Sequence, residues 1–599
     1  MRKSFLLVVA MLCASMSFAQ SYGILVNDSM YFAGSYVEEF EGFQQYLAHV
    51  QVSSGDKLQL YDYENKAAWA VKLNTYSEAG FTYVSTDKCY RASVDGCYDF
   101  YIKLKYNADE LYIGPGSNCG DPININSGEI PYTGSAPARC TDVMFQCFYW
   151  DSYQDKGYGR TKWIDMLADG QAEEIAQWFD LVWLPPMSRS TGGTGYLPIC
   201  YSDLSSQGWG TKPNLVTLLQ TLHQNGAKVV ADIVINHVAG ASGWCGFAKQ
   251  NFGTYGTFEP TAAWICSTDE MNSDTDAGDC YGKATGAADD GYGSEANYGS
   301  GRDWDHQNAQ VRAMFKAYLQ WLRNDIGIDG FRYDYCKGFH NSHINEYNSA
   351  AKAYFSVMEY WDGDVNALQS HLNDAGYNTL TFDFATKYTA FNNGIASNYY
   401  QGLKGPGLLG AGKSRYAVTF LDSHDSFQRD DNEFCGKNNS MKYPGKIQQC
   451  YAYLLSMPGV PCVFYPHWVK FKEQLKPMIN ARYKTGVHSE SAVSDEAGSG
   501  YYKATITGTN GAIRVLIGPN SGYATTPSGY TLAVKGENYG VYYKTNSPRG
   551  NKNENRTPQA IEQVDSNEPA HKNEKFIQDG QLFIRCGEQV FDVQGRRVK

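Results

Sequence analysis

Ionisable side chains follow short apolar runs at four places in the sequence. These places are DIVINH at residues 232–237, GFRYD at 330–334, VME at 357–359 and FLDSHD at 420–425. Two carboxyl groups about 5–5.5 Å apart can hydrolyse a glycosidic bond with retention of configuration, because one attacks the anomeric carbon while the other protonates the leaving oxygen. Asp334 and Glu359 end consecutive runs and are the candidates for such a pair.

A fold that gathers the ends of distant strands must position these carboxyl groups. Between residues 140 and 485, eight β-rich runs alternate with helical segments, as a (β/α)₈ TIM barrel of the α/β class requires. Because the C-terminal ends of barrel strands form one face, the ionisable groups would converge there. A doubly wound sheet is the alternative, but it does not ordinarily need eight units. The predicted strands are 143–148, 181–184, 229–235, 331–333, 355–358, 380–384, 417–421 and 462–465.

The barrel has a long insertion and flanking segments of other kinds. The Gly-rich stretch 238–303, between the third and fourth predicted strands, predicts a subdomain over the active face. Alternating apolar and polar residues predict an all-β sandwich at 22–115 and an all-β C-terminal domain at 486–545. Polar or Pro/Gly/Ser-rich composition predicts the linkers at 116–139 and 546–573, and β character returns in the tail at 574–599.

The N-terminal β unit is either a carbohydrate-binding module or a passive spacer. Aromatic rings suit stacking on the apolar faces of sugars. The candidate platforms in this unit are Tyr61, Tyr63, Trp69 and Tyr101.

Charge and targeting signals bear on partners and compartment. The formal net charge of −12 argues against nucleic acid or an anionic membrane surface as a partner. Residues 1–19 have the charged start, apolar run and small-residue site of a secretory signal peptide, and no later run is long enough for a membrane span.

Export of the chain into an oxidising compartment would permit disulfides. Locally spaced candidate pairs are Cys89 with Cys97 and Cys266 with Cys280, although spacing alone does not define connectivity.

In order and spacing, the four segments resemble the four motif regions of the alpha-amylase family of glycoside hydrolases. Four motifs in the same order are far more specific than any one alone. The resemblance implies an extracellular enzyme that cuts internal α-1,4-glucosidic bonds of starch or glycogen with retention. Stretches that resemble the plant-type branch are LPPM at 184–187, GYLP at 195–198, FDFATK at 382–387, PGVPCVFY at 458–465 and IGP at 517–519.

The resemblance implies a role for each motif residue. Asp334 would be the nucleophile that forms a glycosyl ester, Glu359 the acid/base, and Asp425 the group that grips the distorted sugar. Glu359 must hold a proton, which requires a less polar setting or nearby negative charge. Arg332 lies two positions before Asp334, hence on the same side of the strand, and would keep that carboxylate ionised. The substrate-binding residues would be Tyr196, His237, Arg332, Lys337 and His424.

A structural calcium site is also implied by the resemblance. Asn236 and Asp303 match the family's ligands, and at the position of Gly338 the plant-type branch uses the backbone carbonyl. Oxygen ligands of this kind suit Ca²⁺, which would fix the inserted subdomain to the barrel. The remaining acidic ligand stays open among Asp289, Asp290 and Glu295.

The expected partners are starch, glycogen and malto-oligosaccharides, without nucleic acid or a membrane span, and the chain is expected to act as a monomer. The last residues, 574–599, resemble C-terminal sorting domains of an outer-membrane export route, which would add surface association. Two alternatives stay open. One is another α-glucan-active member of the superfamily, such as a maltogenic, debranching or transglycosylating enzyme. The other is a non-catalytic starch-binding surface protein, which would be expected to lack at least one of the three acids.

Overall fold

The computed structural model places most of the chain, in two compact units, Met1–Asn555 and Arg556–Lys599. The predicted signal peptide, Tyr63 and Glu295 lie outside the described residues. The structure describes residues 22–124 without 28–29, 34, 41–42, 63–66, 70–79, 85–88, 105–109 and 116–122; residues 132–553 without 133, 155–161, 169, 206–207, 294–297, 300, 428–442 and 444; and residues 574–592 without 579–580 and 587–588.

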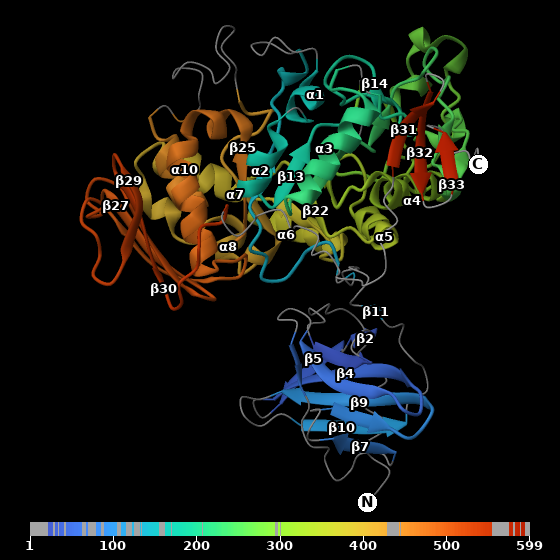
Figure 1. The fold of residues 1–599 in the computed structure, drawn as a ribbon. Helices are drawn as coiled ribbons and strands as arrows, with labels where there is room; N and C mark the ends of the chain where they lie inside the picture. Colours follow the sequence, from blue (N-terminus) through green and yellow to red (C-terminus); the bar gives the residue numbers. More distant parts are fainter. Residues whose placement is uncertain are drawn as a thin grey trace, which may run out of the picture. The chain divides into compact units, whose positions relative to one another are not determined.

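Eight parallel strands close into a barrel, which confirms the predicted fold class (Figure 1). The doubly wound alternative is wrong, because the first strand pairs with the last through Met144 and Cys462. Strand β13 is buried at every position, since helices and barrel interior cover its two faces. The barrel strands are β12 (Met144–Gln146), β13 (Leu181–Leu184), β16 (Lys228–Ile233), β21 (Gly330–Tyr333), β22 (Phe355–Met358), β23 (Leu380–Phe382), β24 (Ala417–Phe420) and β25 (Val460–Phe464).

Amphipathic helices surround the strands. Helix α3 (Lys212–Gln224) begins where the Thr211 side chain accepts a hydrogen bond from the Asn214 backbone, and its leucines at 215, 218, 219 and 222 form the buried stripe. The other helices of the barrel are α2 (Ala172–Trp178), α4 (Ala309–Trp321), α5 (Ser342–Ala351), α6 (Val365–Asp374), α7 (Phe384–Thr386) with the π-helix η8 (Lys387–Ile395), α9 (Ile447–Leu454) and α10 (Tyr465–Thr485).

The insertion between β16 and β21 is closed at its base by a two-stranded pairing. Strand β17 (His237–Val238) runs antiparallel to β20 (Arg302–Asp303), so His237 lies opposite Asp303. The first residues after a catalytic-face strand are thereby joined to the last residues of the insertion.

Both predicted disulfide pairings are wrong. Cys280 is bonded to Cys245, whose Cα lies 5.9 Å away, and Cys266 is a free buried thiol. Cys89 is also free and buried, whereas Cys97 is disulfide-bonded. Disulfides follow the spatial distance between Cα atoms, and loop closure in the insertion brings residue 245 beside 280.

Residues 22–124 form the expected β-sandwich, with a seven-stranded and a four-stranded sheet. Tyr61 is only 6% exposed, so it cannot serve as a sugar platform, whereas Tyr101 is 45% exposed. The side chains of Tyr63 and Trp69 are outside the description. The strands are β1 (Tyr22–Val26), β2 (Met30–Ala33), β3 (Ser35–Phe40), β4 (Phe43–Val52), β5 (Lys57–Asp62), β6 (Ala67–Trp69), β7 (Phe81–Val84), β8 (Cys89–Ala92), β9 (Gly96–Leu104), β10 (Glu110–Pro115) and β11 (Ile123–Asn124).

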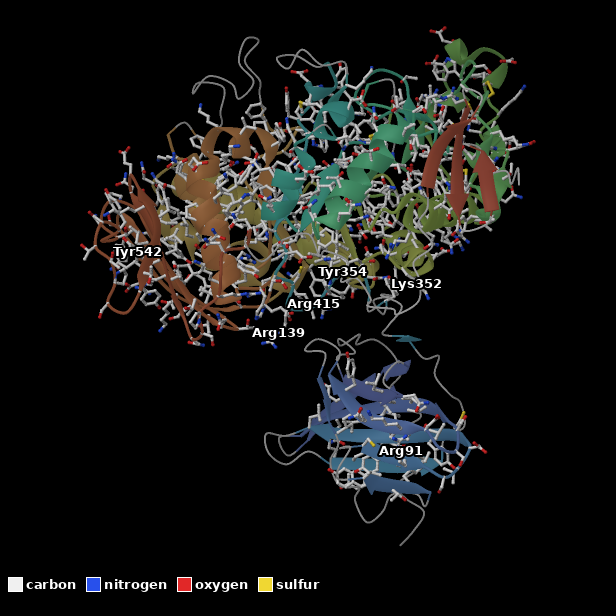
Figure 2. The ribbon with its side chains drawn as sticks, viewed as in Figure 1. Arg91, Arg139, Lys352, Tyr354, Arg415 and Tyr542 are labelled. Carbon is white, nitrogen blue, oxygen red and sulfur yellow. A yellow bond between two sulfur atoms is a disulfide. The ribbon has the colours of Figure 1, made fainter. Side chains whose placement is uncertain are left out.

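Both predicted linkers include residues that the structure shows bound to the surface of the barrel. Arg415 donates to the Ala136 carbonyl at 2.7 Å and Tyr354 donates to Asp142 at 2.8 Å, which ties the segment entering the barrel to its outer surface (Figure 2). At the start of the second predicted linker, the Lys552 backbone donates to Asn480 Oδ1 at 2.9 Å. Polar composition predicted a linker at both places, but these polar groups find partners on the barrel.

The C-terminal domain is a five-stranded antiparallel sheet, and the second unit holds a separate three-stranded sheet. In the described part of the chain, no helix has the length and apolar character needed to cross a bilayer. The strands are β26 (Ala492–Gly498), β27 (Tyr501–Gly508), β28 (Gly511–Ile517), β29 (Thr531–Gly536), β30 (Tyr539–Thr545), β31 (Glu574–Gln578), β32 (Gln581–Cys586) and β33 (Gln589–Asp592).

Arg482 on α10 offers a test of how the last barrel strand is held. Its buried guanidinium donates to the carbonyls of Met457 and Gly459, each at 2.7 Å, just before β25. Arg482→Met should lower the free energy of unfolding by about 3 kcal/mol or more, because each buried carbonyl left without a donor costs about 1–3 kcal/mol. Chemical denaturation measures this. Lys472→Met on the same helix removes a partly exposed ion pair with Glu174 and should cost less than about 1 kcal/mol; equal losses would contradict the assignment.

Candidate active site

One buried guanidinium organises the C-terminal face of the barrel. Arg332, on β21 and 1% exposed, donates to Asp232 at 2.9 Å and to Asp334 at 2.6 Å, and its Nη2 forms an ion pair with Glu359 Oε2 at 2.8 Å. The three carboxylates come from the ends of the neighbouring strands β16, β21 and β22. The structure thus brings Asp334 and Glu359 to the same charged group, although they are 25 positions apart in the chain.

Glu359 has one oxygen engaged and a pKa moved toward neutrality. Its Oε2 accepts from the backbone N–H of Tyr335 at 3.1 Å and forms the ion pair with Arg332. Tyr335 has a φ of 49°, a left-handed conformation that is uncommon outside glycine and that turns this N–H toward the carboxyl group. Burial raises the pKa of Glu359 to about 8, the charges of Asp334 and Asp425 add to the rise, and Arg332 opposes it.

Asp232 completes the cluster and was not predicted as a site residue. Its Oδ2 accepts from Trp183 Nε1 at 3.0 Å and from the Tyr196 hydroxyl at 2.9 Å. Burial raises the pKa of Asp232 to about 7 while Arg332 opposes the rise. A signal existed in the sequence, since an aspartate within an apolar barrel strand needs a buried cation or donors.

Three nearly parallel aromatic rings form another wall. The Tyr196 ring lies 5.1 Å from His424 and 5.9 Å from Trp150, with interplanar angles of 4° and 3°. His424 lies with Nδ1 2.8 Å from Gln146 Nε2 and Nε2 3.1 Å from Asp425 Oδ2. Asp425 keeps 29% of its side-chain surface exposed, and partial burial raises its pKa. Trp150 was missed, although an aromatic residue just after a barrel strand is a detectable signal.

His237 and Lys337 lie on the remaining sides. The His237 ring stacks on Tyr298 at 3.9 Å, and its Nε2 lies 2.8 Å from the Tyr196 carbonyl oxygen. Lys337 Nζ lies 3.9 Å from Asp362. Tyr298, contributed by the insertion, was not among the predicted residues.

These side chains enclose one cleft of about 320 Å³. All of the predicted catalytic and substrate-binding residues line it except Arg332, which lies behind its wall. Carboxyl groups beside flat aromatic rings suit a ligand with many hydroxyls and apolar ring faces. The lining residues are Trp150, Tyr196, His237, Tyr298, Asp334, Tyr335, Lys337, Glu359, Trp361, His424 and Asp425.

Comparison with known proteins agrees with this geometry. Residues 177–497 match the family model described as the catalytic domain of alpha amylase. The chain belongs to the alpha-amylase family. It is 31% identical over 431 residues to "Probable alpha-amylase 2" of Arabidopsis thaliana, which covers 67% of this chain and 94% of that protein. The family resemblance is therefore confirmed, and the chain is a glycoside hydrolase.

Two further relatives differ in length and name. The chain is 28% identical over 444 residues to "Alpha-amylase 3, chloroplastic" of Arabidopsis thaliana, covering 70% of this chain but 45% of that protein. It is 26% identical over 411 residues to "Glucan 1,4-alpha-maltotetraohydrolase" of Stutzerimonas stutzeri, covering 64% and 69%.

A second group of polar atoms lies where the alpha-amylase barrel meets its insertion. Asn236 Oδ1 is buried and has no hydrogen-bond partner among the described residues. A Cβ atom on Gly338 would stand 2.0 Å from this oxygen, so the backbone at Gly338 and the Asn236 amide approach in a way that only glycine permits. A buried acceptor without a donor indicates a cation site.

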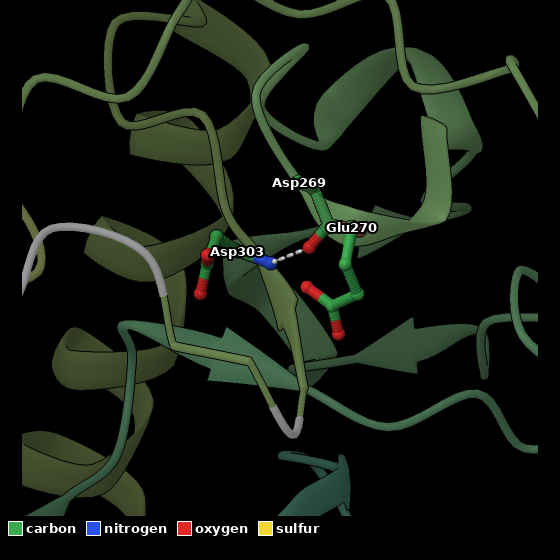
Figure 3. Close-up of side chains that lie close together, drawn as sticks. All are labelled: Asp269, Glu270 and Asp303. Carbon is green, nitrogen blue, oxygen red and sulfur yellow. Dashed lines mark hydrogen bonds between the residues drawn. The ribbon is translucent and has the colours of Figure 1, made fainter. Parts of the chain in front are cut away.

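Acidic side chains surround the same place. Carboxylate oxygens of Asp269, Glu270 and Asp303 lie within 4.8 Å of one another, and the Asp303 backbone donates to Asp269 at 2.9 Å (Figure 3). Burial, with the charges of Asp269, Asp289 and Glu270, raises the pKa of Asp303 to about 9. Asp290 instead lies 2.9 Å from His343. Asp269 and Glu270 were not predicted, since acidic residues in an insertion carry no distinguishing spacing.

Removal of Arg332 should make the enzyme's stability depend on pH. Arg332→Met leaves Asp232, Asp334 and Glu359 without their cation, so burial will raise the pKa values of Asp232 and Glu359 further. Carboxyl groups with folded pKa values above the unfolded ones destabilise the fold as pH rises through that interval. We expect a loss of about 3 kcal/mol or more at pH 8 and a smaller loss at pH 5, by thermal unfolding. An equal loss at both pH values would contradict this.

Proposed function

We propose that the enzyme is an endo-acting alpha-amylase that hydrolyses internal α-1,4-glucosidic bonds of starch and glycogen with retention of configuration. The observation that carries the proposal is that Arg332 holds Asp334 and Glu359 at one wall of a single cleft. Retaining hydrolysis needs two nearby carboxyl groups in different protonation states.

The two steps follow from the contacts of each carboxyl group. Asp334 attacks the anomeric carbon and forms a glycosyl ester, while Glu359 gives its proton to the leaving oxygen. Because Glu359 Oε2 faces the Arg332 guanidinium and accepts from the Tyr335 backbone N–H, the proton resides on Oε1. A pKa of about 8 keeps this proton in place at neutral pH. Deprotonated Glu359 then takes a proton from water, which attacks the ester and releases Asp334.

The other cleft residues bind the sugar at the reacting bond. Asp425 accepts hydrogen bonds from the hydroxyls of this sugar, and His424 donates to them. The negative charge of the Asp425 carboxylate favours the positively charged transition state. Tyr196 stacks on the ring, with His237 completing the pocket. Lys337 contacts sugar on the leaving-group side.

Two exposed tryptophans favour cleavage of internal bonds. Trp150 is 44% exposed and Trp361 is 38% exposed, and both line the cleft. Trp150 follows β12 and Trp361 follows β22, which lie four strands apart in an eight-stranded ring and hence on opposite sides of its mouth. A glucan chain can therefore stack beyond both sides of the reacting bond. The maltotetraohydrolase among the relatives makes release of short products from a chain end the second candidate.

A calcium ion fits the second group of polar atoms, and we assign it a structural role. Asn236, Asp303, the Gly338 carbonyl and Asp289 would hold it, with Asp269 beside them. Bound Ca²⁺ supplies positive charge that offsets the buried carboxylates and joins the insertion to the barrel. It would stand next to His237 but take no part in bond cleavage.

The proposal also assigns roles to the N-terminal sandwich and to the two ends of the chain. Tyr101 on β9 lies directly opposite Tyr112 on β10, which supports binding of α-glucan at this sheet. The predicted signal peptide supports secretion, with 574–599 as a sorting tail.

Substitution of either catalytic carboxyl group tests the proposal. Asp334→Asn or Glu359→Gln should lower starch hydrolysis at least about 10³-fold, because each removes a group that makes or breaks a bond. The melting temperature should stay close to that of the unmodified enzyme. Products of soluble starch, followed by length and by anomeric configuration, should appear first as mixed-length α-anomers.

Each result separates one alternative. β-Anomers would overturn the retaining mechanism, and a uniform short product from the start would support the chain-end candidate. No hydrolysis by the unmodified protein would support the non-catalytic starch-binding alternative.

Chelation tests the calcium assignment. Removal of Ca²⁺ should lower the melting temperature, because a ligand present at about a thousandfold over its dissociation constant stabilises the fold by about 4 kcal/mol. Asn236→Leu should melt at a lower temperature and respond little to chelator. An unchanged transition of the unmodified enzyme would count against the site.

A further inference from the structure

A second buried charged cluster lies beside the catalytic one but has no part in the cleft wall. It contains Lys387 from η8, Asp422 from the loop after β24 and His467 from α10, which are 1%, 2% and 0% exposed. None of the three lines the cleft. A buried ion pair is costly to desolvate and is a weak source of stability, so its presence calls for another explanation.

The Asp422 side chain is hydrogen-bonded to the loop that carries His424 and Asp425. Its Oδ1 accepts from Lys387 Nζ at 3.2 Å and from Ser426 Oγ at 2.9 Å. Ser426 Oγ in turn accepts from the Ser423 backbone at 3.0 Å. The Asp425 backbone donates to Ser423 Oγ at 3.3 Å. These hydrogen bonds link the Asp422 carboxylate, through Ser426 and Ser423, to the backbone of Asp425.

Lys387 also fixes the start of this loop. Its Nζ donates to the Leu421 carbonyl and lies 3.3 Å from the Tyr443 hydroxyl. One ammonium group therefore contacts the backbone that leaves β24 and the side chain of the next residue. The loop cannot rotate about the end of the strand without breaking both contacts.

His467 closes the cluster from the opposite side. The Tyr451 hydroxyl accepts from the Phe464 backbone at 3.2 Å and lies 3.0 Å from His467 Nδ1, so it donates its proton to that nitrogen. The remaining imidazole proton is then on Nε2, which lies 3.8 Å from Asp422 Oδ2. Burial lowers the pKa of His467 to about 4, so the ring is neutral.

We propose that Asp422 is a positioning residue, held by Lys387 and by Ser426, that sets Asp425 and His424 against the sugar. The inference rests on the proposed function, because it assigns a cause to the placement of two residues of that site. The cluster joins this loop to η8 and α10, whereas the loop by itself forms only a short turn. Rigid support for a group that acts in the transition state is worth a large factor in rate, since a displacement of about 1 Å can cost about 10²-fold.

Ser426→Ala is the direct test, because it removes one hydroxyl between Asp422 and the rest of the loop. We expect kcat on a chromogenic malto-oligosaccharide to fall at least about tenfold, with a smaller change in KM. Ser426→Thr retains the hydroxyl and should restore most of the activity. Ser188→Ala is the control, since the Ser188 hydroxyl also has a polar partner, the Tyr318 hydroxyl at 3.1 Å, and lies away from the loop.

A double-mutant cycle shows whether Ser426 acts through Asp425. In the Asp425→Ala background, Ser426→Ala should change the residual kcat by less than about twofold, because the positioned group is already absent. Melting temperatures of Ser426→Ala and Ser188→Ala should agree. An equal fold-loss in both backgrounds, or a Ser426→Ala enzyme as active as the control, would overturn the proposal.

The ion pair itself is tested by replacing both charges together. Lys387→Met with Asp422→Leu leaves no unpaired buried charge, so the fold should persist while kcat falls at least about tenfold. Retained kcat in this variant would overturn the role of the pair. If this double variant does not fold, the double-mutant cycle at Ser426 tests the proposal instead. If the unmodified enzyme does not hydrolyse starch, both the proposed function and this inference are wrong. If the unmodified enzyme hydrolyses starch and the variants keep its kcat, only this inference is wrong.

Discussion

The contact of Arg332 with three buried carboxylates is the interaction on which the active site depends. Without the guanidinium, the charges of Asp232, Asp334 and Glu359 would repel one another in a nearly dry space. With it, the pKa values of Asp232 and Glu359 still rise to about 7 and about 8, because burial outweighs one shared cation. The cluster therefore holds more negative charge than it can fully neutralise, and a proton on Glu359 is the result.

The barrel makes this contact possible at a low conformational cost. Strands β16, β21 and β22 are neighbours in a closed sheet, so the residues that end them lie at adjacent positions of one rim. In these three strands the residues of the charged cluster lie near or just after the C-terminal end. The charge of the site thus stays at the rim of the barrel. The insertion adds Tyr298 to the cleft and Asp303 to the second polar group from a single segment.

The fold was predictable because its signals are local and repeated. Eight apolar runs of strand length, separated by helical segments, leave few architectures, and polar residues at their ends indicate a common face. Trp150 and Asp232 were missed, since their roles depend on which neighbours the barrel brings to them. The disulfide of Cys245 with Cys280 depends on the path of a long loop, which spacing does not encode. The linker ends were misplaced because polar composition does not distinguish solvated groups from groups that find partners on a barrel.

The two buried charged clusters solve different physical problems on adjacent strands. Around Arg332 the excess negative charge faces a cleft, so a proton can leave and return as the chemistry proceeds. Around Lys387, one ammonium meets one carboxylate, and the neutral His467 lies 3.8 Å from the second oxygen of that carboxylate without adding charge. A balanced pair resists a change of protonation, since loss of either charge would leave the other buried alone. Such a cluster is suited to holding a loop in one place while the neighbouring cluster changes its charge during each turnover.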